Sequence, residues 1–111
     1  MALKRLLRLR KPSEFKSVYN DGKIARGKLL GLFFKPNQLS CNRTGCSIPG
    51  KKVKSSVHRN RLRRLISESC MKNSEIISGY DLVWVIQHSV PVSVSFKEVD
   101  EEVAGLLKRV K

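Results

Sequence analysis

One segment of the sequence concentrates side chains that bind phosphate. From position 51 to position 64 the chain reads Lys-Lys-Val-Lys-Ser-Ser-Val-His-Arg-Asn-Arg-Leu-Arg-Arg. Guanidinium groups hold phosphate oxygens through paired hydrogen bonds, and the serine-rich start of a helix leaves N–H groups free to bind an anion. The segment therefore predicts an anion-binding site on a rigid element.

The charge of the whole chain indicates a polyanionic partner. The 111 residues include 23 Lys and Arg against 9 Asp and Glu, which gives a net charge of +14. The excess is regional, because residues 1–67 hold 18 basic and 2 acidic side chains whereas residues 68–111 hold 5 and 7. Like charges four apart on a helix, such as Arg59 and Arg63, repel each other unless a polyanion lies across them. We expect that polyanion to be nucleic acid; a solvated helix face is the alternative.

Side chains of the catalytic type are scarce in the basic part of the chain. Glu14 and Asp21 are its two carboxylates, and Mg²⁺-dependent hydrolysis needs a cluster of them. His58 and His88 have no recognisable nucleophile or carboxylate partner, so we expect both to be structural. Four further carboxylates, expected on a solvated helix face, are Glu98, Asp100, Glu101 and Glu102. These features argue against a protein that hydrolyses its substrate alone, and they predict no metal or other cofactor bound by the protein itself.

The apolar segments are too short for a membrane span. The longest, at 29–34 and 82–86, fall far below the roughly 20 residues that a transmembrane helix needs, and the basic N-terminus lacks the apolar core of a secretory signal. Cys41, Cys46 and Cys70 form no CxxC pair, which favours reduced thiols. We expect a cytoplasmic protein with no membrane partner, folded as a single domain over 1–111 with a flexible basic segment at 1–11.

Hydrophobic periodicity predicts three helices and three strands. Ser13 is the expected cap of a first helix, in which Phe15, Val18 and Tyr19 share one face. Apolar residues on both faces of 28–35 predict an interior strand, and Trp84 is expected inside a buried strand. The elements expected in chain order are a helix at 13–20, strands at 28–35 and 43–48, a helix from 55 or 56 to 73, a strand at 80–86, and a helix that follows a cap at Ser95 and ends near 110.

The order and spacing of these features resemble the bacterial ribonuclease P protein component. The signature is Arg59-Asn60-Arg61, preceded by Lys51-Lys52 and followed by Arg63-Arg64-Leu65-Ile66. The resemblance covers nearly the whole chain, and its other parts are the helix around 15–19, Arg26, Gly45, the strand at 80–83 and a closing helix. Two departures precede the signature: Lys54 stands where the family usually has glycine, and Pro49-Gly50 makes the link to the lysine pair one residue longer.

The resemblance implies both a fold and a function. The fold is an α/β two-layer sandwich in the order α-β-β-β-α-β-α, with a left-handed crossover around the Arg-rich helix; a short strand near 23–26 would complete this order. The function is removal of the 5′ leader from precursor tRNA, in which a catalytic RNA holds the Mg²⁺ ions and carries out the hydrolysis. The protein is then an accessory subunit whose partners are this RNA and precursor tRNA, with no protein partner required.

The resemblance also assigns two sets of residues. Those expected to contact the catalytic RNA are Lys51, Lys52, Arg59, Asn60, Arg61, Arg63 and Arg64. Phe15 and Tyr19 are expected to line a groove against the sheet, where a leader of any sequence can stack because every base has an aromatic face. Further candidates for this groove are Lys16, Arg26 and Phe34, the last on an exposed sheet face with Leu30 and Leu32. Simple core packing is the alternative, above all for Phe15.

A structural ribosomal protein is the competing hypothesis. Small basic α/β domains with Arg-rich helices are common in ribosomes, so composition cannot separate the two functions. Co-purification chiefly with ribosomal RNA would favour the ribosomal protein.

Overall fold

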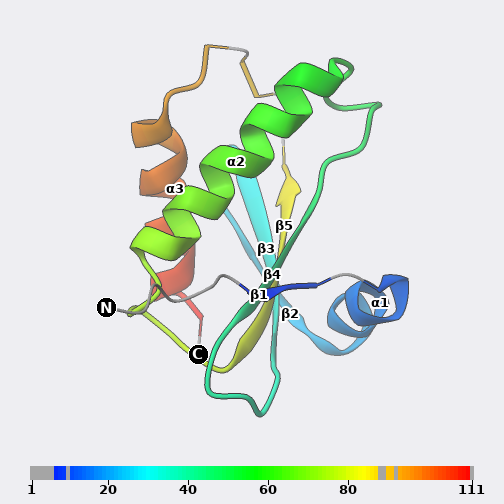
Figure 1. Ribbon diagram of the computed structural model, residues 1–111, viewed down its shortest axis with the longest axis vertical. Helices are drawn as coiled ribbons and strands as arrows, with labels where there is room; N and C mark the ends of the chain where they lie inside the picture. The colour runs from blue at the N-terminus through cyan, green and yellow to red at the C-terminus, as the bar shows by residue number, and fades with distance from the viewer. Residues whose placement is uncertain (1–6, 10, 88–89, 92, 111) are drawn as a thin grey trace.

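The computed structural model describes residues 7–9, 11–87, 90–91 and 93–110. After one short strand, the described elements follow the order α-β-β-β-α-β-α (Figure 1), so the order that the resemblance implies is confirmed, including the strand at 23–26. None of the described helices is long and apolar enough to cross a bilayer. The elements are β1 (Leu7–Arg8), α1 (Pro12–Asp21), β2 (Lys23–Arg26), β3 (Leu30–Pro36), β4 (Arg43–Ser47), α2 (Ser56–Lys72), β5 (Tyr80–Ile86) and α3 (Phe96–Lys108).

Strand β5 lies in the middle of a five-stranded sheet with the order β1-β4-β5-β3-β2. Strand β4 runs parallel to both β1 and β5, whereas β3 is antiparallel to β5 and β2. The apolar character of both its faces predicts that β3 is interior, and this is confirmed. Helix α2 connects the parallel neighbours β4 and β5 and therefore forms a crossover unit, whose left hand stays a prediction.

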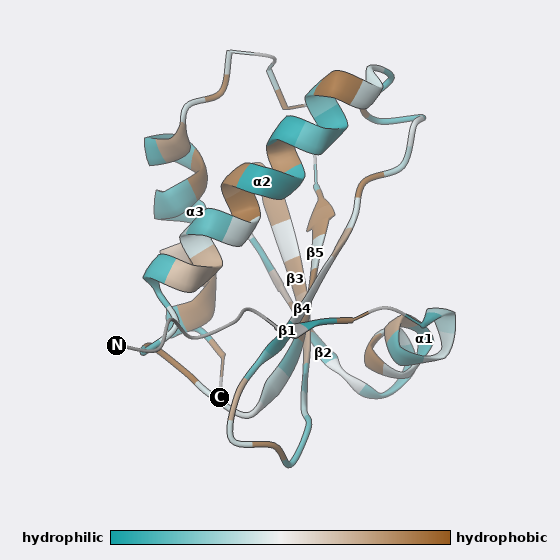
Figure 2. Ribbon diagram, viewed as in Figure 1, coloured by the Kyte–Doolittle hydropathy of each residue, from teal (hydrophilic) through white to brown (hydrophobic). Residues whose placement is uncertain are grey.

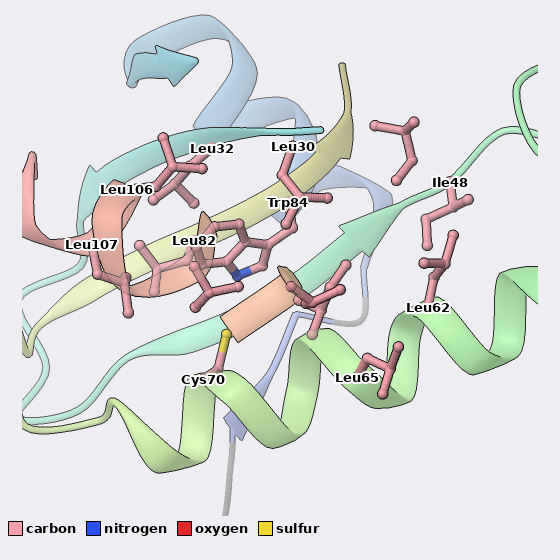
Figure 3. Close-up of a cluster of buried hydrophobic side chains, with 14 of the residues drawn as sticks. Leu30, Leu32, Ile48, Leu62, Leu65, Cys70, Leu82, Trp84, Leu106 and Leu107 are labelled. Atoms are coloured by element: carbon pink, nitrogen blue, oxygen red, sulfur yellow. The ribbon is translucent and has the colours of Figure 1, made fainter. Parts of the chain in front are cut away.

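Helices α2 and α3 cover one face of the sheet. Leu30, Leu32 and Trp84 point to this face and are at most 1% exposed. Leu62 of α2 and Leu106 of α3 belong to the same buried cluster, which Figure 3 shows around the indole of Trp84. Burying a leucine side chain contributes about 1.5–3 kcal/mol relative to leaving it in water. The cluster therefore anchors the Arg-rich helix firmly to the sheet.

Helix α1 packs on the other face of the sheet. Val83, which alternates along β5 with residues of the main cluster, is fully buried there against Val18 of α1, and Leu9 is buried beside them. Phe15 and Phe33 are half-buried around them. Figure 1 shows α1 well apart from α2 and α3. Because Val18 is the one fully buried residue of α1, this helix is held to the sheet by a small apolar contact.

The helix starts agree with the sequence in two cases of three. As predicted, α2 begins at Ser56 and Ser95 caps α3; the side chain of Ser55 caps α2. The expected cap at Ser13 is wrong, because α1 begins at Pro12 and the N–H of the residue before it donates to Glu14 Oε1 at 2.9 Å. Proline is favoured in a first helical turn, where its missing N–H would have no helical partner.

Four C-terminal carboxylates are expected on a solvated helix face, and this expectation is wrong for Asp100 and Glu102, which have hydrogen-bond partners within the fold. Glu102 accepts hydrogen bonds of 3.0–3.2 Å from the backbone N–H groups of residues 28–30. This clamp keeps residues 28 and 29 in a loop, which is why β3 begins at Leu30 instead of position 28. The side chains that donate to Asp100, at 2.7–2.9 Å, are Ser69, Lys72 and Asn73 of the α2 C-terminus.

The N-terminal segment is partly ordered. A flexible segment is expected at 1–11, but Leu7 and Arg8 pair with Arg43 and Thr44 of β4. Leu9 is only 6% exposed. The expectation is therefore wrong for residues 7–9, which strand pairing and burial hold in place, while residues 1–6 and 10 lie outside the described part of the chain.

Candidate nucleic-acid interface

Helix α2 presents the basic residues of the signature to solvent. Leu62, Leu65 and Ile66 of this helix belong to the main core, whereas Asn60, Arg63 and Arg64 are exposed. Figure 2 shows hydrophilic and hydrophobic residues interspersed along the helix. The first turn holds no acidic residue, so the positive end of the helix dipole adds to the side-chain charges. This side of α2 is a strongly cationic surface.

Three of the predicted RNA contacts also hold neighbouring loops in place. Arg59 Nη1 donates to two carbonyl oxygens in the loop before α2, at 2.9 and 3.0 Å. Arg61 Nη2 donates to Val94 O at 2.7 Å, and Lys52 Nζ donates to Ile86 O at 2.9 Å. A guanidinium group has five N–H donors, so Arg59 keeps donors for a phosphate while its own position is fixed.

A cleft of about 510 Å³ lies between α2, the neighbouring strands β1 and β4, and α1. Asn60, Arg63 and Arg64 line it from α2, where Arg63 Nη1 also donates to Asn60 Oδ1 at 3.2 Å. On the other side, the Phe15 ring lies against Gly45, where an added Cβ would come within 2.6 Å of the ring. The full lining is Arg8, Leu9, Phe15, Thr44, Gly45, Cys46, Asn60, Arg63, Arg64, Ser67, Glu68 and Met71.

Arg8 is a cleft residue that the sequence prediction missed. It lies far from the signature in the chain, and the parallel pairing of β1 with β4 brings it opposite Thr44 and into the lining of the cleft. Its position depends on a strand of two residues, which is too short to show a periodic pattern. The only signal in the sequence is the basic character of the N-terminus.

Cys46 lines the same cleft as Arg8 and Arg63. Burial raises its pKa to about 12, while the positive charges of Arg63 and Arg8 act in the opposite direction. Burial also raises the pKa of the Cys70 thiol. Both thiols are therefore protonated at neutral pH and are poor nucleophiles. Cys41 is exposed.

Tyr19 and Phe33 form an aromatic pair on the α1 side of the sheet. The two rings meet edge to face, with 4.9 Å between their centroids, and Tyr19 is 37% exposed. Phe15, one turn before Tyr19, is half-buried against Gly45. The Phe15 ring is therefore partly packed into the fold, whereas the Tyr19 ring is more accessible to a base.

The placement of Phe34 in this groove is wrong. Phe34 is 6% exposed and faces α2 and α3 together with Leu30 and Leu32, near Tyr80. Successive residues of a strand point to opposite faces, so the aromatic residue that β3 contributes to the groove is Phe33. Both faces of β3 are apolar, and the hydrophobic pattern therefore does not indicate which of them the two long helices cover.

The two basic groove candidates are both exposed. Arg26 lies on edge strand β2 opposite Gly31, two residues from Ile24, which is opposite Phe33. Arg26 therefore shares the sheet face of Phe33. Lys16 lies on α1 next to Phe15. Whether these side chains contact RNA stays a prediction.

His58 has a structural environment. It is 7% exposed, and its Nε2 lies 3.0 Å from Val90 O, as a packed histidine would. His88 lies outside the described residues. Among the residues with described positions, no group of three or more His, Cys, Asp or Glu side chains is placed to hold a metal ion.

The loop before α2 accommodates Lys54 without strain. The backbone N–H groups of Lys52 and Val53 both donate to Pro49 O, at 3.1 Å, and close a turn. Within the described ranges, Gln38 and Gly79 are the positions with a positive φ. Lys54 therefore has a backbone conformation that does not require glycine.

Together, the α+β fold, the cationic helix inside a crossover unit and the adjoining aromatic side chains define a small domain of the nucleic-acid-binding class. Comparison with known families makes the assignment specific, because the sequence profile of the family described as Ribonuclease P matches residues 3–111. The chain belongs to the ribonuclease P protein family.

Individual relatives agree with this assignment. The chain is 38% identical to the ribonuclease P protein component of Caldanaerobacter subterraneus subsp. tengcongensis over 95% of this chain and 90% of that protein. It is 37% identical to that of Alkaliphilus oremlandii, over 97% and 94%. The solved RNase P protein of Thermotoga maritima superposes with a TM-score of 0.84 at 27% identity, covering 94% of this chain and 97% of that one. The Staphylococcus aureus RNase P protein, at 19% identity and a TM-score of 0.82, shares the fold. The comparisons lend no support to a ribosomal protein.

Proposed function

We propose that the protein is the accessory subunit of ribonuclease P in the cytoplasm, where it binds a catalytic RNA and the 5′ leader of precursor tRNA and so promotes leader removal. The observation that carries this proposal is the continuity of two surfaces. Arg63 and Arg64 of α2 and Arg8 line one side of a cleft, and Phe15 lines the other side, one helical turn from Tyr19, which pairs with Phe33.

The cationic surface suits the folded catalytic RNA. Phosphate contacts give affinity without requiring a base sequence, and α2 is a rigid element that holds Asn60, Arg63 and Arg64 in fixed positions. Arg59, Arg61 and Lys52 donate to backbone carbonyls. These bonds keep the loop before α2 and the segment between β5 and α3 close to this surface. In this proposal, the predicted RNA contacts and Arg8 act together as one binding surface.

The aromatic groove suits a single-stranded leader. Stacking of a base on an aromatic side chain contributes about 1–3 kcal/mol and tolerates any base. Tyr19 offers an accessible ring, Phe33 supports it, and Arg26 on the same sheet face can pair with a backbone phosphate. This arrangement supports binding of leaders that differ in sequence.

The hydrolysis itself is assigned to the RNA, which would hold the Mg²⁺ ions. Glu68 is the carboxylate in the lining of the cleft, and one carboxylate does not make the cluster that Mg²⁺-dependent hydrolysis needs. Glu14 and Asp81, on the α1 side of the sheet, pair with Arg43 at 2.7 and 2.6 Å. In α3, Asp100 pairs with Lys72 at 2.8 Å. The protein then contributes positive charge and a stacking surface.

Crosslinking mapped by residue tests this proposal. A photoreactive group at position 19, in the complex with the catalytic RNA and precursor tRNA, should label nucleotides of the leader. The same group at Lys97, which is exposed on α3 over the other sheet face, serves as the control and should label the leader weakly. Labelling of the tRNA body from position 19, with none in the leader, would contradict the groove assignment.

A further inference from the structure

The attachment of α1 to the sheet depends on polar contacts as well as apolar ones. Val18 is the one fully buried side chain of the helix. Lys35 of β3 donates to Ser17 Oγ at 2.7 Å and lies 3.4 Å from Asp21 Oδ2. A second tether, from Arg43 of β4, reaches the first turn of the helix at Glu14.

The Arg43 guanidinium is held in a fixed plane. Its Nε and Nη2 donate to the two oxygens of Asp81 at 2.8 and 2.6 Å, and its Nη1 donates to Glu14 Oε2 at 2.7 Å. Asp81 is itself only 6% exposed and accepts a further bond from Asn37 Nδ2 at 3.0 Å. The hydrogen bond to Asp81 is the main cause that raises the pKa of Arg43 above its ordinary value. Arg43 therefore reaches α1 from a rigid base.

This ion pair lies next to the contact that seats the aromatic residues. Arg43 and Gly45 are two positions apart on β4, opposite Asp81 and Val83 of β5, and so share one sheet face. Glu14 and Phe15 are consecutive on α1. The helix thus crosses the strand with Glu14 on Arg43 and the Phe15 ring on Gly45.

We propose that Arg43 is a positioning residue for the nucleic-acid cleft: through Glu14 it fixes the orientation of α1, and thereby the places of Phe15 and Tyr19. This inference rests on the proposed binding of the leader to these rings. A helix with one buried side chain can tilt, and a binding site that must be ordered on binding loses affinity. The Asp81–Arg43–Glu14 chain orders the helix in advance.

The test uses Arg43→Lys and Glu14→Gln in the complex with the catalytic RNA. Lysine keeps the charge but cannot make the planar three-way contact, and Glu14→Gln removes the ion pair while keeping the size of the side chain. For each variant, affinity is measured for precursor tRNA with a leader and for mature tRNA without one. We expect the ratio of the two affinities to fall by about three- to tenfold. Affinity for the catalytic RNA alone should stay within about twofold, because the cationic side of α2 is unchanged.

A matched control separates positioning from general destabilisation. Asp100→Asn disrupts a comparable hydrogen-bonded network between α2 and α3, remote from α1. It should lower the Tm and leave the ratio unchanged. A lower Tm with an unchanged ratio in both Arg43→Lys and Glu14→Gln would overturn the positioning role.

The variant Tyr19→Ala distinguishes the positioning role of Arg43 from the proposed binding of the leader, on which that role rests. If Tyr19→Ala lowers the ratio and the Arg43 and Glu14 variants do not, leader binding stands and the positioning role is wrong. If Tyr19→Ala also leaves the ratio unchanged, both are overturned. Since Arg43 and Glu14 act through one contact, the double variant should lower the ratio no further than the stronger single variant does.

Discussion

At the scale of single residues, the structure separates aromatic side chains that support the fold from those available to a ligand. Phe34 lies in the main core and Tyr19 lies at the surface, although both are aromatic residues near the N-terminal third of the chain. Phe34 points from β3 into the core under α2 and α3, whereas Tyr19 lies on α1, which buries only Val18. We therefore expect removal of the more exposed side chain to cost less unfolding free energy than removal of the buried one.

The paired variants Phe34→Ala and Tyr19→Ala test this separation. Phe34→Ala should lower the free energy of unfolding by about 3–5 kcal/mol because it leaves a cavity in the core. Tyr19→Ala should cost less than about 1.5 kcal/mol, because the ring is partly in water and its lost contact is mainly one aromatic pair. Denaturant titration measures both. Equal losses would contradict the burial difference.

Gly45 is required by the close approach of Phe15. In Gly45→Ala the new Cβ would meet the Phe15 ring at 2.6 Å, so the ring must move. We expect a loss of about 1–2 kcal/mol in unfolding free energy and a displaced Phe15 ring in a crystal structure or by NMR. As a control, Gly105→Ala on α3 has open space around its Cβ and should stabilise the helix by up to about 1 kcal/mol. An unmoved Phe15 in Gly45→Ala would refute the contact.

At the scale of elements, α3 is joined to α2 by Asp100. The hydrogen bond from Lys72 is the main cause that lowers the pKa of Asp100, and Ser69 and Asn73 contribute. A carboxyl group whose pKa is lower in the folded chain stabilises the fold above its unfolded pKa, near 3.9. That contribution is lost as the pH falls through the folded value.

The Tm of the protein should therefore fall on acidification below about pH 4 partly through Asp100. In Asp100→Asn the Tm should be lower at neutral pH, and its fall between neutral pH and about pH 3 should be smaller than in the unaltered protein. Thermal unfolding followed across this range measures both slopes. Parallel curves for the two proteins would show that Asp100 has no shifted pKa.

Sequence periodicity was enough for the elements that carry long patterns. The helices at α2 and α3 and the strand β5 appear where their apolar residues predict, with serine caps at Ser55 and Ser95. It failed where a position depends on a distant partner. Strand β1 is two residues long and exists through its pairing with β4, and the start of β3 is set by Glu102 from the far end of the chain.

In the candidate site, too, the sequence shows the residues that lie on one long element and not those that depend on a distant partner. The basic residues of α2 are visible in the sequence because they are contiguous and lie on one helix. Arg8 and Phe33 could not be assigned, since one depends on strand pairing and the other on which face of β3 is covered. The Arg43–Glu14–Asp81 contact joins three separate elements, and nothing in the spacing of these residues indicates it.

At the scale of the whole molecule, the charge predicts how binding responds to salt. If the cationic surface contacts five to eight phosphates, log K for the catalytic RNA should fall against log salt with a slope of roughly −4 to −7. Replacing Arg63 or Arg64 with glutamine should make the slope less steep by about 1. Titrations at several salt concentrations measure this. A slope near zero would rule out a phosphate-based interface.

The proposed role of this domain is to assist an RNA that performs the cleavage. A reconstitution of the complex from its separate parts tests this role. Precursor tRNA is incubated with the cognate catalytic RNA at a Mg²⁺ concentration too low for efficient cleavage, with and without the protein. We expect the protein to raise the rate of leader removal and the protein alone to cleave nothing. An unchanged rate on addition of folded protein, or cleavage by the protein without the RNA, would contradict it.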